Sequence, residues 1–449
     1  MTPKTMLPLV VALLVAMGPT AAAQSPQVEE ALSQRLMAHA LSVAVGIACP
    51  NCEMADLQRE MLTERVAHYS FRVRVGDGQY DVIEMHHVVT EAAPWVPART
   101  RDALFALPGG AASFSLTYLA DAIAAAPGHR NLGTFLADND VDVWGLSHSW
   151  ALLPPGVTDF TFMDGWGLEH QLDNIGIGLA IARRARSLEG NGDGQLILAG
   201  MSDGARDAYT YLDRETQVPP GLRRVKGFIP IDIHLKLERN DLRQLACDRA
   251  SAQWQWIKSG SYGDDSGVVT RMAGFAAENR PNAPSPVLAG LTNLQAALLI
   301  GTASYIFITD NPTLHWVAGR FDSQGLPYGL QYTRTDFYLR LLQSFTPVIP
   351  RRLVMDYEDI TCEAADVPFD DHLSEVAVPV LYVGAQGGYG DYGVYSTTLL
   401  GSRDVTVHLA STWPAAARML DFGHADILYG DNAESLVWQP ILAWIRAHR

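Results

Sequence analysis

The chain alternates between short apolar runs and longer stretches whose apolar residues recur every three or four positions. The short runs are bounded by Gly, Pro, Asn or Asp, and they predict buried strands. These strands are expected at residues 68–75, 80–90, 103–107, 141–146, 195–199, 225–231, 378–383 and 405–409. The helical spacing predicts helices between most of them, including one over about 114–125, the longest over 168–188 and the last over 434–447, where we expect Pro440 to cause a kink. Strands that alternate with helices in this way are typical of a mostly parallel, doubly wound sheet.

Two helices are predicted ahead of the first strand. The first covers residues 28–45 and the second covers about 54–66, so residues 24–67 are expected to form an N-terminal helical segment. Residues 68–449 then form the domain that contains the sheet.

The first 23 residues have the features of a secretory signal peptide. Lys4 supplies a basic start, residues 6–17 form an apolar run, and Ala21 to Ala23 resemble a cleavage site. The apolar run is too short to span a membrane as a helix. We therefore expect a mature chain that begins near Gln24 and is secreted or periplasmic.

The alternation of strands and helices stops between residue 233 and about residue 369. This stretch contains a Pro-rich segment at 280–286 and an apolar helical pattern near 294–308. It predicts a largely helical insertion after the strand at 225–231, placed so that it could form a lid.

Charge restricts the classes of partner. The chain has 33 basic and 49 acidic residues, a net charge of −16, and removing the signal peptide takes away Lys4 and leaves −17. An acidic protein is a poor match for nucleic acid or for an anionic membrane surface. We therefore expect neither as a partner.

Two histidine and cysteine patterns bear on metal binding. Cys49 and Cys52 have C-x-x-C spacing, but no second pair of zinc ligands follows. His86 and His87 are adjacent in a predicted strand and should face opposite sides of the sheet. Neither pattern predicts a metal site.

The four cysteines are expected to form disulfides, because export favours oxidised pairs. Cys247 and Cys362 stand near the two ends of the insertion, so a bond between them would staple it. Cys49 and Cys52 could then pair with each other. Four cysteines allow three pairings, and the spacing favours this one without excluding the others.

A G-x-S-x-G pentapeptide, Gly200-Met201-Ser202-Asp203-Gly204, follows the predicted strand at 195–199 and opens a predicted helix. This places Ser202 where a strand turns sharply into a helix, so its hydroxyl is lifted clear of the backbone at a helix N-terminus. These are the conditions that a serine nucleophile needs. The alternative is a glycine-rich turn that contains an incidental serine.

Two other segments fit the same arrangement. Pro108-Gly109-Gly110-Ala111 follows the strand at 103–107, and Asp421-Phe422-Gly423-His424 follows the last predicted strand. With the pentapeptide and the insertion, these motifs resemble the α/β-hydrolase fold family, in particular its secreted serine-esterase and lipase-like members. The resemblance covers about residues 68–449.

The resemblance implies a set of site residues. Ser202 would be the nucleophile and His424 the general base, in the chain order of this family. The oxyanion hole would be formed by the backbone N–H of Asp203 and by that of Gly110 or Ala111.

The acid of the triad departs from the commoner pattern of the family. That pattern places a carboxylate about three residues after the strand that ends here at Gly384, where this chain has none. Asp232, at the end of the strand at 225–231, and Asp391, in a glycine-rich run, are the candidates, and the more rigid Asp232 is preferred. Two aspartates lie too near His424 in sequence to be preferred, and for them a role in supporting the site residues is open: Asp421 and Asp426.

The resemblance implies hydrolysis of carboxylic esters through an acyl-enzyme, with no metal or organic cofactor. The substrate could be a small or lipid-like ester. Two other functions remain open on the sequence alone: a catalytically inactive binding protein on the same scaffold, and a cofactor-free haloperoxidase-like activity that uses the same triad.

Overall fold

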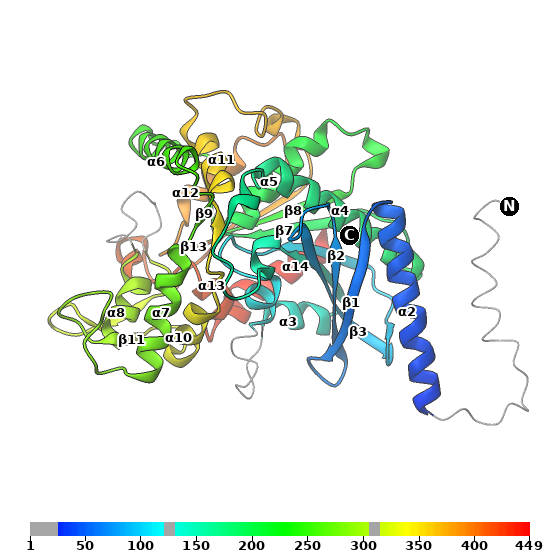
Figure 1. Ribbon diagram of the computed structural model, residues 1–449, viewed down its shortest axis with the longest axis horizontal. Coiled ribbons are helices and arrows are strands. Elements are labelled where there is room, and N and C mark those ends of the chain that lie inside the picture. Colours follow the sequence, from blue (N-terminus) through cyan, green and yellow to red (C-terminus); the bar gives the residue numbers. More distant parts are fainter. Residues whose placement is uncertain (1–25, 121–130, 305–314) are drawn as a thin grey trace, which may run out of the picture.

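The computed structural model describes residues 26–120, 131–304 and 315–449 (Figure 1). The predicted signal peptide lies outside these residues, as does the C-terminal part of two predicted helices, near 114–125 and 294–308.

A ten-stranded sheet forms the centre of the described part, in the order β1-β2-β3-β6-β5-β7-β8-β13-β14 with β4 beside β3. Neighbours from β6 through to β14 are parallel, whereas β1, β2, β3 and β6 pair antiparallel. The mostly parallel sheet is therefore confirmed. Its strands are β1 (Glu53–Met61), β2 (Val66–Arg74), β3 (Val82–Ala93), β4 (Val96–Pro97), β5 (Asp102–Leu107), β6 (Val141–Ser147), β7 (Leu196–Met201), β8 (Val225–Ile231), β13 (Val380–Ala385) and β14 (Val405–Ala410).

Helices cover both faces of this sheet, as the doubly wound prediction requires. On one face lie α2 (Pro26–Ala48), α4 (Leu168–Leu188) and α5 (Asp203–Thr216), and on the other α3 (Leu132–Asp138) and α14 (Gln439–Ala447). The strands supply both cores by alternation. In β5, Phe105 packs into the first core, whereas Leu104 and Ala106 pack into the second.

Shorter helical segments join these elements. The predicted helix near 114 is a π-helical turn in its described part, and the predicted kink at Pro440 is a change from π-helix to α-helix. These segments are η2 (Ser115–Leu119), η4 (Ser149–Leu152), η5 (Thr161–Met163), η6 (Pro220–Leu222), η7 (Leu373–Glu375), α12 (Asp391–Thr397), η8 (Ala415–Leu420), α13 (Asp426–Tyr429) and η9 (Glu434–Trp438).

Helix α2 confirms the first predicted helix. Among the described residues it is the one helix long and apolar enough to cross a membrane by length and composition. It packs along α4 and β1 at the outer end of the sheet and buries Met37 and Leu41, while Leu32 and Leu36 are exposed.

The second predicted helix, 54–66, is wrong, because most of this stretch is the edge strand β1. The antiparallel register between β1 and β2 shifts between Ala55 and Gln58, and Asp56 there has a positive φ of 56°. This bulge places Met54 and Leu57 on the same face although they are three residues apart. A spacing of three is typical of a helix, so the sequence pattern was misleading.

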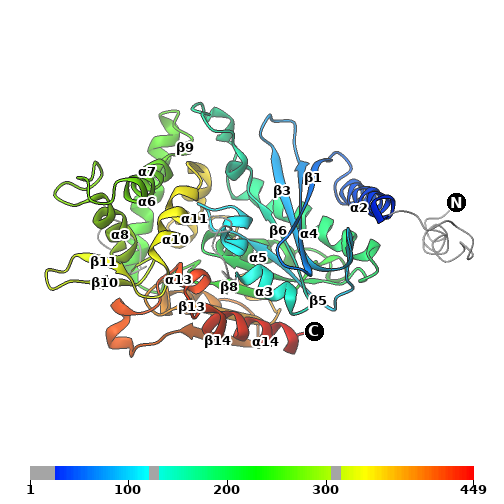
Figure 2. The same cartoon turned by 90° about the horizontal axis from the view of Figure 1, so that it is seen from below.

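The insertion between β8 and β13 is largely helical, as predicted. Figures 1 and 2 show it gathered at the end of the molecule opposite α2. Its described elements are α6 (Asn240–Lys258), β9 (Gly263–Asp264), α7 (Ser266–Asn279), α8 (Asn293–Thr302), β10 (Gly319–Phe321), β11 (Pro327–Leu330), α10 (Thr335–Ser344), β12 (Ile349–Pro350) and α11 (Arg351–Cys362).

Two disulfides are present, and they are the predicted pairs. Cys247 and Cys362 join α6 to α11, with their Cα atoms 4.7 Å apart, and Cys49 pairs with Cys52. The first bond therefore ties the beginning of the insertion to its end.

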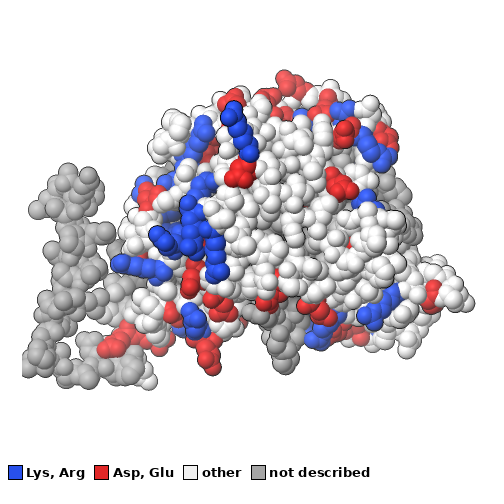
Figure 3. All heavy atoms as spheres, turned by 180° about the vertical axis from the view of Figure 1, so that it is seen from behind, with Lys and Arg blue, Asp and Glu red and all other residues white. Residues whose placement is uncertain are grey.

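Charged side chains are unevenly spread over the surface. On the face shown in Figure 3, Lys and Arg side chains gather toward one side, acidic groups lie among them and along the lower border, and uncharged atoms cover most of the rest.

Candidate active site

Ser202 stands at a strained turn between β7 and α5. Its backbone has φ 55° and ψ −132°, and its N–H donates a 3.0 Å hydrogen bond to the carbonyl of Ile231 on β8. The turn is tight because both flanking glycines lack a side chain. A Cβ on Gly200 would lie 2.2 Å from the carbonyl oxygen of Gly204, and one on Gly204 would lie 2.4 Å from that of Pro108. The predicted strand–turn–helix setting of Ser202 is therefore observed.

His424 and Asp232 are in direct contact. His424 Nδ1 lies 2.8 Å from Asp232 Oδ2, and because a carboxylate oxygen accepts, Nδ1 carries the proton of this hydrogen bond. Asp232 is fully buried and His424 is 6% exposed, so water has little access to the pair. In the neutral ring with this tautomer, Nε2 of His424 is the nitrogen that can accept a proton.

The glycine-rich run after β13 does not supply the carboxylate that contacts His424. Its backbone N–H groups instead bind the carboxylate of Asp232. The N–H groups of Ala385 and Gly390 donate to Oδ1 at 2.7 and 3.0 Å, and that of Tyr389 donates to Oδ2 at 3.3 Å. Asp391, the other candidate acid, is an exposed residue at the first position of α12. The structure thus brings His424 together with Asp232.

The glycine loop at 108–111 lies beside Ser202. A Cβ on Gly109 would be 3.2 Å from the Cβ of Ser202. The backbone N–H groups of Gly110, Ala111 and Asp203 donate to no acceptor within the described residues. All three residues line the same cavity as Ser202, so unpaired donors are available next to its hydroxyl.

The loop that carries His424 is held by two buried aspartates. Asp421 accepts hydrogen bonds from the N–H groups of Thr412, Trp413 and Phe422. Asp426 accepts from the N–H groups of Gly423 and Ala318, and burial raises its pKa to about 6. Both residues support the histidine loop, as their sequence positions suggested.

A segment of the insertion also holds this loop, which the sequence did not indicate. The carbonyls of His315 and Trp316 accept from the N–H groups of His424 and Ala425 at 3.1 and 2.7 Å. The Trp316 ring lies edge-on to the imidazole of His424, with the ring centres 6.0 Å apart. These contacts join residues more than one hundred positions apart, and no local motif marks them.

Asp203 extends its carboxylate over Gly110, where an added Cβ would lie 2.6 Å from Oδ2. Burial raises the pKa of this carboxyl, and Arg206, at 3.7 Å, opposes the rise. Apart from His424, Asp203 is the only Asp, Glu, Lys, Arg or His among the described residues that line the cavity.

The cavity beside Ser202 has a volume of about 650 Å³ and is mostly apolar. One wall comes from the sheet and its loops, including Met201, and the other comes from the insertion, including Trp316. Other apolar lining residues are Val269, Val287, Leu288, Ile300, Leu341, Leu342, Phe345, Ile349, Leu428 and Tyr429. A cavity of this size and composition fits an uncharged organic group.

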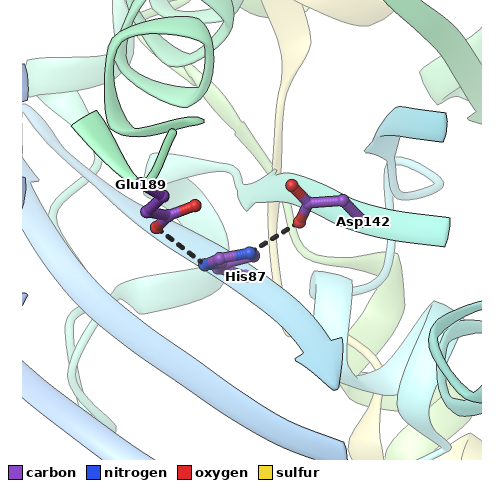
Figure 4. Close-up of side chains that lie close together, drawn as sticks. All are labelled: His87, Asp142 and Glu189. Carbon is purple, nitrogen blue, oxygen red and sulfur yellow. Dashed lines mark hydrogen bonds and ion pairs between the residues drawn. The ribbon is translucent and has the colours of Figure 1, made fainter. Parts of the chain in front are cut away.

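A second group of ionisable side chains lies elsewhere, at His87, Asp142 and Glu189, within 4.8 Å of one another (Figure 4). Asp142 contacts Nε2 of His87 at 2.6 Å, and Glu189 faces Nδ1 at 3.9 Å, so the carboxylates lie on opposite sides of the ring. The guanidinium of Arg186 also pairs with Asp142. Since a cation already neutralises Asp142, this arrangement is better suited to a buried ion network than to a metal site. His86, next in sequence, points to the other face of β3, as predicted, and its Nε2 lies 2.8 Å from the hydroxyl of Ser147.

Comparison with known proteins identifies the fold of this chain. No protein-family model matches the sequence, and no curated protein matches it. Among solved structures, a putative lipase from Sulfolobus solfataricus superposes with a TM-score of 0.58 at 19% identity, over 88% of this chain and 99% of that one. A soluble variant of monoglyceride lipase from Saccharomyces cerevisiae gives a TM-score of 0.45 at 12% identity, over 88% of this chain and 96% of that one. Together with the sheet order and the position of Ser202, the likeness to the first structure shows that this chain has the α/β-hydrolase fold.

Proposed function

We propose that this protein is a serine hydrolase that cleaves carboxylic esters, with Ser202 as nucleophile, His424 as general base and Asp232 as the acid. The observation that carries the proposal is the 2.8 Å contact between His424 Nδ1 and the buried Asp232, in a cavity that Ser202 also lines. The solved structure that superposes with a TM-score of 0.58 is described as a putative lipase, and this supports the same class of reaction.

The reaction proceeds in two steps. Ser202 Oγ attacks the ester carbonyl while His424 Nε2 takes the hydroxyl proton, and Asp232 stabilises the resulting imidazolium. Backbone N–H groups of Asp203 and of the 108–111 loop receive the oxyanion. The C–O bond then breaks, His424 gives its proton to the leaving alcohol, and water repeats the sequence to release the acid.

The cavity favours an ester with an uncharged, apolar group. Its lining offers many apolar side chains but only Asp203 as a charged partner, so an anionic substrate would lose its hydration without compensation. A carboxylate on the substrate, close to the scissile ester bond, should therefore weaken binding.

The two disulfides and the apolar N-terminus support export to an oxidising compartment. We therefore keep the proposal of a secreted or periplasmic protein whose signal peptide is cleaved near Ala23.

A series of p-nitrophenyl esters of graded acyl length tests the proposal, together with labelling by a fluorophosphonate. Ser202→Ala should remove labelling and lower kcat on the order of 10⁴-fold or more, while Ser344→Ala, which changes an exposed serine outside the cavity lining, should leave both unchanged. A wild-type protein that is folded but neither hydrolyses the esters nor reacts with the probe would instead support an inactive scaffold that binds its ligand.

A further inference from the structure

The carbonyl groups of the 107–111 segment are all held by hydrogen bonds. Tyr118 Oη donates to the carbonyl of Leu107 at 2.8 Å, and Ala112 N–H donates to that of Gly109 at 3.0 Å. The carbonyl of Ala111 accepts from Thr346 N–H of the insertion at 2.8 Å. The direction of each peptide plane in this segment is thus fixed from outside the segment.

The other two carbonyls are held by a pair of stacked aromatic rings. Trp150 Nε1 donates to the carbonyl of Gly110 at 2.7 Å, and His148 Nε2 donates to that of Pro108 at 3.3 Å. The two rings are 4.3 Å apart and nearly parallel, and both are buried. Neither ring lines the cavity, so they support the loop from behind.

In a trans peptide the C=O of one residue and the N–H of the next point in opposite directions. The Gly110 carbonyl points toward Trp150, so the N–H of Ala111 points away from Trp150. This N–H donates to no acceptor among the described residues, and Ala111 lines the cavity with Ser202. Sequence reasoning left Gly110 and Ala111 as equal candidates for the second oxyanion donor.

We propose that Trp150 is a positioning residue for the oxyanion hole: its indole N–H fixes the Gly110–Ala111 peptide plane so that the N–H of Ala111 faces the developing oxyanion. The inference rests on the proposed hydrolase function and adds to it the choice of donor and the group that aims it. His148 acts in the same way on the Pro108–Gly109 peptide plane and holds Trp150 in place by stacking.

A chain of buried polar groups fixes His148 in turn. Burial lowers the pKa of His148 to about 4, so the ring is neutral, and its Nδ1 accepts from Gln171 Nε2. Gln171 Nε2 also donates to Asp207 at 3.1 Å, and the hydroxyl of Tyr357 donates to the other oxygen of Asp207 at 2.6 Å. With the proton on Nε2, each contact in this chain has one donor and one acceptor. The network therefore holds His148 in the tautomer that the loop requires.

The alternative is that Trp150 only fills space. Trp150→Phe separates the two roles, because phenylalanine keeps an aromatic ring beside His148 but lacks the N–H. The matched control is Trp438→Phe: Trp438 is 3% exposed against 2% for Trp150, and its Nε1 has no partner among the described residues.

The assay compares kcat and KM on one p-nitrophenyl ester, and inhibition by a trifluoromethyl ketone, whose adduct with serine places an oxyanion in the hole. For Trp150→Phe we expect kcat to fall about tenfold to a hundredfold with KM within about twofold, less than the loss caused by deleting a donor. The affinity for the ketone should fall by the same factor. Trp438→Phe should match the wild type in all three quantities.

His148→Phe gives a second reading if Trp150→Phe does not fold, and it should show the same pattern with a smaller loss of kcat. If the wild type hydrolyses esters and Trp150→Phe behaves like Trp438→Phe, the positioning role is refuted and the hydrolase function stands. If the wild type does not react with any ester, the hydrolase function and the positioning role of Trp150 are both refuted, since there is then no oxyanion to hold.

Discussion

Gly388→Ala is the substitution that most directly tests how Asp232 reaches His424. A Cβ at this position would lie 2.3 Å from Asp232 Oδ2, the oxygen that contacts Nδ1 of His424. It would also lie 3.0 Å from the backbone nitrogen of His424. Because Gly388 is not among the glycines with positive φ, alanine fits its backbone conformation. The effect of the substitution is therefore steric, strongest at the carboxylate of Asp232 and weaker at the backbone of His424.

The magnitude follows from these distances. Ordinary contacts of a Cβ begin at 3.4 Å, so the carboxylate or the loop must move by about 1 Å from the 2.3 Å contact. Asp232 cannot withdraw freely, because three backbone N–H groups hold it. A displacement of about 1 Å costs roughly 10²-fold in rate, and complete loss of the acid costs roughly 10⁴-fold. We expect a fall in kcat between these two values.

The assay is kcat and KM on a p-nitrophenyl ester, with circular dichroism and the melting temperature as checks of folding. KM should change little, since Gly388 is not among the described residues that line the cavity. Gly165→Ala is the control, because a Cβ there would meet nothing within 4 Å and Gly165 also lacks a positive φ. A folded Gly388→Ala protein with the kcat of the wild type would refute the assignment of Asp232 as the acid.

Three further predictions follow from the structure. Asp232→Asn should lower kcat about 10³-fold or more, whereas the exposed Asp391→Asn should lower it little; a loss confined to the second variant in ester assays would move the acid to the loop after β13. Replacing Cys247 and Cys362 by alanine should lower the free energy of unfolding by about 2 to 4 kcal/mol in denaturant titrations, because the bond closes a loop with a sequence separation of 115. Burial raises the pKa of Asp207 from 3.8 to about 7, so the folded state holds a proton that the unfolded state has lost in this window. The contribution of Asp207 to stability should therefore fall as pH rises from about 4 to 7, by a few kcal/mol at most, and Asp207→Asn should flatten this part of the stability–pH curve.

The parts of the site that the sequence predicted are those set by local structure. The turn at Ser202 follows from a strand, two glycines and a helix within about 20 residues, and Asp232 follows from its place at the end of β8. The preference for Asp232 over Asp391 rested on the rigidity of its position and not on a local motif. The run from Gly387 to Gly390 can adopt many conformations, and only tertiary contacts direct its N–H groups toward Asp232.

Strand β1 and the contacts of the insertion with the histidine loop escaped prediction for two different reasons. In β1 the bulge near Asp56 changes the spacing of buried residues, so the pattern indicated a helix. His315 and Trp316 hold His424 through backbone carbonyls, and a carbonyl is present at every residue. No residue type marks such a contact in a sequence.

The contacts of His315 and Trp316 with the histidine loop change the role that we assign to the insertion. The sequence suggested that the insertion could form a lid, yet three hydrogen bonds also join its residues 315–318 to the loop of His424 and Asp426. Two are between backbone groups, from His424 N–H to the carbonyl of His315 and from Ala425 N–H to that of Trp316, and the third runs from Ala318 N–H to the carboxylate of Asp426. The carbonyl of Ala111 is held from the insertion as well, by Thr346. A movement of the whole insertion as one body would break these bonds and release both the loop of His424 and the 108–111 loop. The catalytic arrangement that we propose therefore depends on the insertion being in place, and a chain without it would lack the contacts that position His424 and Ala111.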